Sequence, residues 1–231
     1  MANELRGGGA VLIFHNPAVV IFTIPRTGST TLHMALNRRA TQSISYPPAA
    51  KHMSVRDFEQ SLLPDLLAEG INPRRVVVLR EPLQRLRSWY TYRKRRNLKD
   101  ATVSTRDMTF EDFVLASLEE TPPPAAQIGS QYKFVCNRAG ELGVDHLFCM
   151  ERPKLFHRFL RRHLGVAPKT HRYNAAPATR DADDGLTRKT RRALYAAREE
   201  EFALYKAVQA TGQLNRRQVY PDAATSTPTA E

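Results

Sequence analysis

The sequence predicts an α/β fold of three layers, in which helices cover both faces of a central parallel sheet. Two runs of apolar residues, 19–24 and 76–79, are continuous enough to form strands that are buried on both faces. A helical pattern follows each run, so strand and helix alternate along most of the chain. Parallel strands end on one edge of the sheet, which is where such folds bind their ligands.

The first strand pair is expected over residues 11–14 and 19–24, on either side of a turn at Asn16-Pro17. This apolar stretch is broken by the turn and is shorter than the roughly 20 residues that a membrane span needs. No small-residue cleavage site follows it, so a signal peptide is not expected either. A helix should begin near Ser29 and run to about Arg39.

Capping residues place the next helices. Ser54 is a good N-cap and Gly70 a good stop for a helix that Pro64 kinks or splits. Pro82 opens the helix that follows the second buried strand, because proline suits the first turn. Thr109 caps a further helix.

The second half of the chain is read from the same signals. A third strand is expected within residues 144–150, and a helix follows it over residues 153–165. One long last helix is expected over residues 187–210. We therefore expect a single domain over residues 1–212 and a loose polar tail over residues 213–231.

The composition is that of a globular protein, with 231 residues of which 42% are hydrophobic and 25% charged. The 35 Lys and Arg against 23 Asp and Glu give a net charge of +12, which favours an anionic ligand or partner. No zinc-finger spacing or aromatic RNA-binding motif accompanies this charge. Two cysteines, Cys136 and Cys149, do not make a disulfide framework, so a reduced, cytoplasmic location is expected.

The segment "IPRTGSTT" joins the second strand to its helix. A buried strand, a tight loop and a helix N-terminus direct several backbone N–H groups at one point, where the helix dipole adds positive potential. Gly28 permits close approach of an anion, and Arg26 supplies a guanidinium. Three hydroxyl groups follow, on Ser29, Thr30 and Thr31. The loop suits a phosphate-like group; a plain turn that starts a helix is the competing interpretation.

The loop lacks two features of a nucleotide-triphosphate loop. A Walker loop places lysine directly after its last glycine, whereas Ser29 follows Gly28 here. The strand over residues 76–79 is followed by Arg80-Glu81 rather than by an aspartate that could hold magnesium. These differences argue against a magnesium-dependent kinase or ATPase.

A second strand–loop–helix unit reads "VVVLREPLQRLRSWY". Arg80 stands at the strand end, and Ser88 lies eight residues later, about two turns into the helix. Because parallel strands open on the same edge, the two units are expected to form a pair of anion sites. A ligand with two separated phosphate-like groups fits such a pair.

In these segments the chain resembles the sulfotransferases that use 3′-phosphoadenosine 5′-phosphosulfate (PAPS). "IPRTGSTTL" is similar to their 5′-phosphosulfate loop, and "LREPLQRLRSWY" is similar to their 3′-phosphate motif. "KHMS", residues 51–54, resembles a stretch between those motifs in the membrane-type and bacterial, carbohydrate-sulfotransferase-like branch. The resemblance spans most of residues 19–208.

The resemblance implies the same α/β fold, a P-loop-like phosphosulfate loop, and transfer of a sulfuryl group from PAPS to an acceptor hydroxyl or amine. Arg80 and Ser88 would bind the 3′-phosphate, and no metal would be needed. The 5′-phosphosulfate would be held by Arg26, Thr27, Gly28, Ser29, Thr30 and Thr31.

Two residues, Arg26 and His52, are expected to carry out the chemistry. Arg26 stands where the family usually has lysine, so it keeps the charge that stabilises the departing phosphate but is not expected to donate a proton. The acceptor must lose a proton, and a neutral histidine suits that task near pH 7. His52, between the two motifs, is the expected general base, with His33 as the alternative. An ordinary polar residue before an N-cap is the competing interpretation of His52.

Two other functions stay open: a nucleotide-dependent, P-loop kinase-like phosphotransferase, and a non-enzymatic basic protein that binds nucleic acid. The acceptor is not named by the sequence. Residues 40–50 and 97–107 are expected to form variable loops around it. The basic excess is compatible with an acidic glycan, and neither a nucleic-acid partner nor a membrane span is expected.

Overall fold

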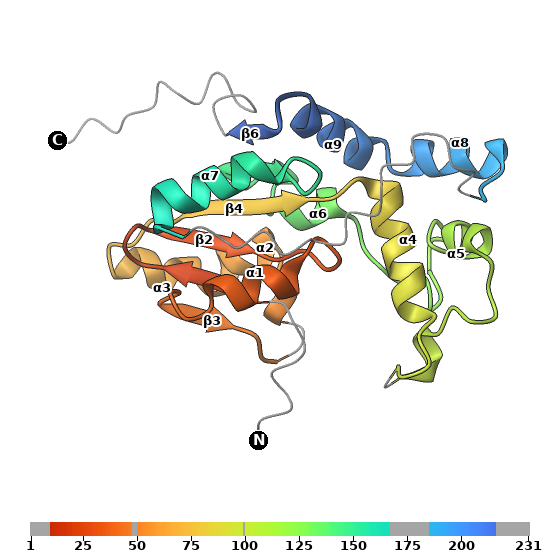
Figure 1. The fold of residues 1–231 in the computed structure, drawn as a ribbon, viewed down its shortest axis with the longest axis horizontal. Helices are drawn as coiled ribbons and strands as arrows, with labels where there is room; N and C mark the ends of the chain where they lie inside the picture. The colour runs from red at the N-terminus through yellow and green to blue at the C-terminus, as the bar shows by residue number, and fades with distance from the viewer. Residues whose placement is uncertain (1–9, 48–49, 99, 167–184, 216–231) are drawn as a thin grey trace.

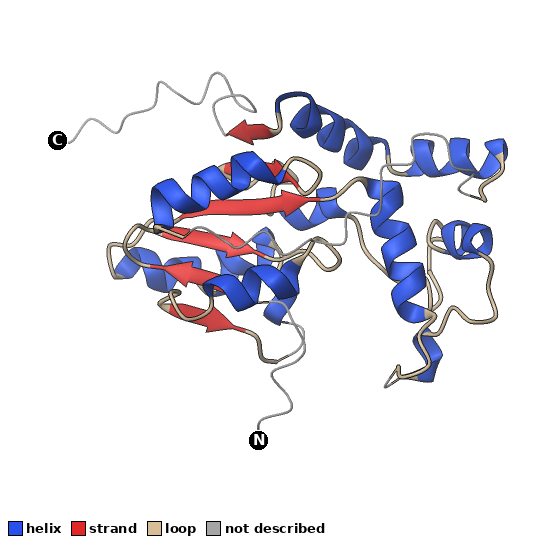
Figure 2. Ribbon diagram, in the orientation of Figure 1, coloured by secondary structure: helices blue, strands red, loops and turns tan. Residues whose placement is uncertain are grey.

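The computed structural model describes residues 10–47, 50–98, 100–166 and 185–215. There, one sheet has the strand order β3-β1-β2-β4-β5-β6 (Figures 1 and 2). The strands are β1 (Val11–Phe14), β2 (Val19–Phe22), β3 (Gln42–Ile44), β4 (Arg74–Leu79), β5 (His146–Cys149) and β6 (Gln213–Asn215).

The helices alternate with these strands. They are α1 (Ser29–Leu36), α2 (Val55–Ser61), α3 (Leu63–Ala68), α4 (Pro82–Arg93), α5 (Phe110–Ala116), α6 (Gln131–Val135), α7 (Pro153–Leu164), α8 (Arg188–Ala197) and α9 (Glu199–Thr211), with short 3₁₀ helices η2 (Ala50–His52) and η3 (Ala101–Val103). Among the residues that the structure describes, no helix is both long and apolar enough to cross a bilayer.

The predicted α/β class is confirmed, but the sheet is mixed rather than wholly parallel. β2, β4 and β5 run parallel at its centre. β1, β3 and β6 pair antiparallel with their neighbours. Only residues 15–18 link β1 to β2, and so short a link can join only antiparallel strands. Parallel β2 and β4 need a long crossover, here residues 23–73.

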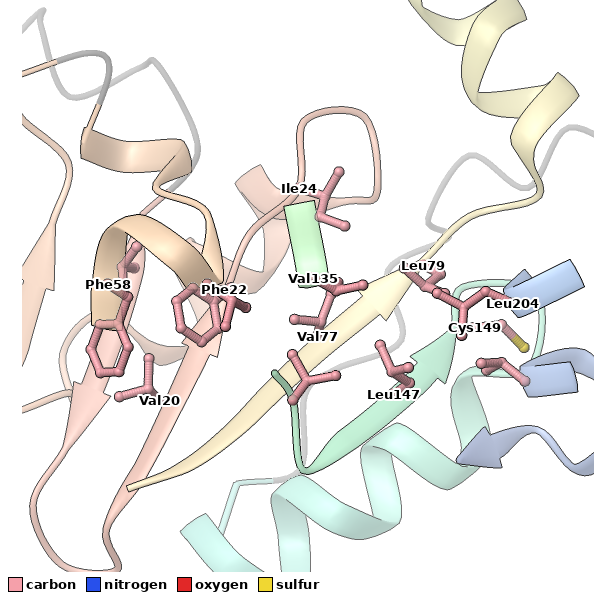
Figure 3. Close-up of a cluster of buried hydrophobic side chains, with 14 of the residues drawn as sticks. Val20, Phe22, Ile24, Phe58, Val77, Leu79, Val135, Leu147, Cys149 and Leu204 are labelled. Carbon is pink, nitrogen blue, oxygen red and sulfur yellow. The ribbon is translucent and has the colours of Figure 1, made fainter. Parts of the chain in front are cut away.

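Two apolar cores fill the spaces between the sheet and its helices. Successive residues of a strand point to opposite faces, so Val77 faces one core and Val78 the other. α2, α3, α6 and α9 cover the first face, and α1 and α7 cover the second (Figure 1). In Figure 3, Phe22 of β2 meets Phe58 of α2, and their ring centroids are 5.2 Å apart. The three predicted layers are therefore present.

A third apolar cluster lies beyond the carboxyl ends of β2 and β4. It joins α4, α5 and α8 around Leu86, Phe113 and Leu194. Figure 1 shows these helices to the right of the arrowheads of β2 and β4. This helical unit supports α4, which carries the second anion motif, at the sheet edge where the first motif lies.

The local signals for helix ends are confirmed. Ser54 and Asp57 form a capping box at the start of α2, and Thr109 with Asp112 forms another at α5. Gly165 ends α7 in the left-handed conformation. Pro82 stands in the first turn of α4, and Pro64 falls in the first turn of α3, so the helix expected over residues 54–70 is split.

Two boundaries near the C-terminus differ from the prediction. The helix expected over residues 187–210 is divided into α8 and α9, because the backbone at Arg198 (φ −129°, ψ 31°) leaves the helical range. Gln213–Asn215, at the start of the expected tail, pairs with β5 as β6. Residues 216–231 lie outside the described part of the chain, and the single domain over residues 1–212 stays a prediction.

Candidate active site

The first anion loop leads from β2 into α1. Arg26 (φ 73°) and Gly28 (φ 81°) both adopt the left-handed conformation, which glycine tolerates and arginine rarely adopts. Gly28 is the N-cap residue of α1 and has no side chain with which to bond the N–H groups of the first turn. The start of α1 is therefore not closed by its own cap residue, and its dipole favours an anion there.

The hydroxyl residues of this loop differ in exposure. Thr27 and Ser29 are buried, Thr31 is half-buried and Thr30 is exposed. The hydroxyl of Thr27 donates to the carbonyl of Ile24 over 2.8 Å, so it closes the turn. The Thr27 side chain therefore stabilises the conformation of the loop itself.

The second loop leads from β4 into α4 and is closed by an acid. The Glu81 carboxylate accepts the N–H groups of Leu83 at 3.1 Å and Gln84 at 2.6 Å. Burial raises the pKa of Glu81. Burial also lowers the pKa of Arg80, whereas the neighbouring carboxylates of Glu151 and Glu81 oppose that shift. Arg80 therefore lies among acids, at a helix start that is already capped.

The two predicted anion motifs meet in space. Arg26 Nε donates to Ser88 Oγ over 3.0 Å, and Arg80 Nη1 donates to the carbonyl of Arg26 over 3.1 Å. The Arg26 guanidinium also stacks 4.7 Å from the ring centroid of Tyr92. Burial lowers the pKa of Arg26, and the positive charges of Arg95 and Arg80 lower it further. A bound anion would relieve this repulsion, as expected of a site for a doubly phosphorylated ligand.

His52 is held in one tautomer. It ends η2, and its Nδ1 lies 2.6 Å from the carbonyl of Thr23, just after β2. Because a carbonyl only accepts, Nδ1 carries the proton and the neutral ring keeps its lone pair on Nε2. The Thr23 hydroxyl lies within hydrogen-bond distance of the Lys51 carbonyl at 3.3 Å and so helps to hold η2. Burial lowers the pKa of His52, and Lys51 and Arg85 lower it further, whereas the bond to the Thr23 carbonyl opposes the shift. The net shift is downward, which keeps the ring neutral near pH 7.

A family comparison agrees with this arrangement. The model of the sulfotransferase family matches residues 10–208, which include both anion loops and His52. The chain belongs to the sulfotransferase family. Its activity is therefore that of a transferase of sulfuryl groups. The resemblance to sulfotransferases is confirmed at the level of the family, and the membrane-type and bacterial, carbohydrate-sulfotransferase-like branch stays a prediction. No curated protein and no solved structure matches the chain significantly.

Three buried residues of this sulfotransferase were not among the predicted site residues. Arg85 Nε donates to the carbonyl of Pro25 in the first loop over 3.3 Å. Gln131 bonds to both the N–H and the carbonyl of Arg80, at 3.0 and 2.9 Å. Glu201 accepts from Gln131 at 3.0 Å and lies 3.8 Å from Arg85. Arg85 is the second arginine of the "LREPLQR" segment, so this motif could have identified it. No motif in the sequence marks Gln131 or Glu201.

A small pocket opens beside the first loop, between α1 and α7. Its wall is mainly apolar and includes Leu32, Val78, Met150 and Phe156. Gly28 of the loop also lines it. The anion site of this sulfotransferase therefore adjoins an apolar surface. His33, the alternative base, lies on α1 and is half-buried.

Proposed function

We propose that this sulfotransferase takes its sulfuryl group from PAPS and transfers it to a hydroxyl or amine of an acceptor. The observation that carries the proposal is the contact between the two anion motifs, in which Arg26 meets Ser88 and Arg80 bonds to the first loop. PAPS carries its 3′- and 5′-groups on one ribose, so it needs two anion sites that adjoin. A guanidinium group suits each of these two anion sites, because its planar arrangement of N–H donors matches the oxygens of a phosphate.

The described residues fit this donor. Arg80 and Ser88 would bind the 3′-phosphate. The 5′-phosphosulfate would be held by Arg26, Thr27, Gly28, Ser29, Thr30 and Thr31.

In the proposed reaction, the acceptor oxygen bonds to sulfur while the bond between sulfur and the bridging oxygen of the donor breaks. His52 Nε2 takes the acceptor proton, since Nδ1 keeps its own proton in the bond to Thr23. Arg26 and the loop N–H groups stabilise the negative charge that develops on the departing phosphate. The products are the sulfated acceptor and 3′-phosphoadenosine 5′-phosphate (PAP).

A kinase-like phosphotransferase is disfavoured by the residues at the same positions. The residue directly after Gly28 is Ser29 rather than lysine. The acid after β4, Glu81, caps α4. Within the described ranges, no group of three or more His, Cys, Asp or Glu side chains is placed to hold a metal ion. That the proposed reaction needs no divalent metal stays an expectation from the family resemblance.

A thermal-shift screen separates the candidate functions. PAP should raise the melting temperature, whereas ATP with Mg²⁺ and an oligonucleotide should leave it unchanged. Transfer of label from PAPS should then proceed in EDTA. Activity that EDTA abolishes and Mg²⁺ restores would favour the kinase-like function. Oligonucleotide binding that weakens steeply with salt, without a response to PAP, would favour a nucleic-acid-binding protein.

The acceptor and the location are further parts of the proposal. Arg95 is exposed and lies 5.2 Å from the ring centroid of Tyr92, the ring that also contacts Arg26. This cation beside the site makes an acidic glycan the first acceptor to test. Cys136 and Cys149 are both free and buried, in keeping with the proposed cytoplasmic location. Labelling of cell extracts with PAPS, followed by identification of the labelled product, would name the acceptor.

A further inference from the structure

Three buried polar side chains link both anion loops to helix α9. Arg85 of α4 is 3% exposed, Gln131 of α6 is 1% exposed and Glu201 of α9 is 3% exposed. Burial of such groups is unfavourable unless their hydrogen bonds and charges are satisfied. Their bonding partners therefore show what the network holds in place.

Gln131 clamps the end of strand β4. Its Oε1 accepts the N–H of Arg80 at 3.0 Å, and its Nε2 donates to the carbonyl of Arg80 at 2.9 Å. The same Nε2 donates to Glu201 Oε1 at 3.0 Å. The backbone of the residue proposed to bind the 3′-phosphate is thus bonded on both sides by one amide, whose orientation Glu201 fixes.

Arg85 ties the first loop to the same network. Its Nε donates to the carbonyl of Pro25 at 3.3 Å, and its two terminal nitrogens donate to Gly129 and Ile128 at 3.1 and 3.0 Å. Burial lowers the pKa of Arg85 to about 10, while the negative charge of Glu201 opposes that shift. Arg85 therefore stays charged near pH 7 and depends on Glu201 as its nearby counter-ion.

We propose that Glu201 is a positioning residue for donor binding: it sets Arg80 through Gln131, and it sets the Pro25–Arg26 end of the first loop through Arg85. This inference rests on the proposed PAPS donor. Glu201 reaches the site only through other side chains, so its loss should act by displacing the two anion loops relative to each other. A displacement of about 1 Å at a binding group can cost on the order of 100-fold in rate, so the coupling is measurable.

A purely structural role is the alternative, and it predicts a different result. If Glu201 only stabilises the fold, its loss lowers the melting temperature without changing which nucleotide is preferred. If it positions Arg80, its loss weakens binding of PAP more than binding of adenosine 5′-phosphate, which lacks the 3′-group. The ratio of the two affinities is therefore the deciding measurement.

The experiment compares Glu201→Gln and Gln131→Leu with wild type by titration of PAP and of adenosine 5′-phosphate. Glu59→Gln is the matched control, because Glu59 pairs with Arg75 at the opposite end of β4. We expect about a 10-fold loss in the preference for PAP in both network variants and less than a 2-fold change in the control, in line with a charge-assisted contact that is displaced rather than removed. Glu201→Asp, which keeps the charge, should recover part of the preference.

The results of these titrations either support or overturn the positioning role of Glu201. Folded network variants that keep the wild-type preference would overturn the inference, even if their melting temperatures fall. If Glu201→Gln does not fold, the ratio in Gln131→Leu decides alone, because that change removes the clamp on Arg80 without altering charge. Wild-type protein that binds neither nucleotide would contradict the proposed donor and this inference together, whereas wild-type preference with unchanged variants contradicts this inference alone.

Discussion

The loops that lead from β2 into α1 and from β4 into α4 are built alike, but their helices begin differently. α1 begins at Gly28, which offers no side-chain cap. α4 begins at Glu81, whose carboxylate already accepts two N–H groups of the first turn. The cap residue of α1 therefore leaves its first turn to a ligand, whereas the first turn of α4 is already bonded to Glu81, and we propose that the side chains of Arg80 and Ser88 hold an anion at the second loop.

The two loops also differ in their charge. Burial and the cations Arg95 and Arg80 lower the pKa of Arg26, so the first loop has positive charge in excess. At the second loop the carboxylates of Glu151 and Glu81 offset the charge of Arg80. We propose that the first loop stabilises charge that develops during the reaction, and that the second loop recognises a group that stays unchanged. The predictions below test this division.

The largest effect is expected at His52, which is anchored beside the first loop. His52→Ala should reduce kcat by about 10²–10⁴-fold, the usual contribution of a general base, while PAP affinity changes little. Turnover assays and calorimetry with PAP on the folded variant measure the two effects, and His33→Ala, at the alternative base, is measured beside it. Near-normal turnover would move the base elsewhere, with His33 next; lost PAP binding would make His52 a support of the nucleotide site.

The recognition role of the second loop is tested by Arg80→Ala. A charge-assisted contact contributes about 1.5–3 kcal/mol, so PAP binding should weaken by about one to two decades. The preference for PAP over adenosine 5′-phosphate should largely disappear. Arg74→Ala is the control, since Arg74 is an exposed arginine at the other end of the same strand. A folded Arg80→Ala protein that keeps the preference would remove Arg80 from the 3′-phosphate site.

The open helix start of the first loop is tested by Gly28→Ala. A side chain in the left-handed conformation costs about 1–2 kcal/mol, so PAP affinity should fall by about 5- to 30-fold if the loop shifts to relieve the strain. Gly70→Ala is the control, because Gly70 has a similar φ of 74° and open space around its Cα. Equal PAP affinity in both variants would show that the backbone of the first loop does not contact the donor.

The smallest effect is a shift in a pH profile. Burial, Lys51 and Arg85 all lower the pKa of His52 below its ordinary value of 6.5. The base works when deprotonated, so the midpoint of the acidic limb of kcat/KM should lie below pH 6.5. A profile of kcat/KM from pH 5 to 8 checks this. An acidic limb centred above 6.5 would mean that a group other than His52 titrates.

Much of the fold and of the candidate site could be predicted because the signals are local. Caps act within one helical turn, so Ser54, Thr109 and Pro82 marked helix starts correctly. The two loop motifs concentrate their chemistry in a few consecutive residues, so residues 24–31 and 80–88 could be paired from the sequence. Their contact is confirmed, and their binding of an anion stays a prediction. Three-residue strands such as β3 and β6 carry too short a pattern for such recognition.

The sequence by itself determined the α/β class, the two strand–loop–helix units and the family, because these depend on local pattern and on consecutive residues. Only the tertiary structure decided which charges are buried. Residues 199–201 are three consecutive glutamates, yet only Glu201 is buried. Besides the nearby Arg198, it meets Gln131 and Arg85, which lie 70 or more positions away. A glutamate in a helical run carries no mark of such a partner, since burial of its charge depends on which distant donors the fold brings to it.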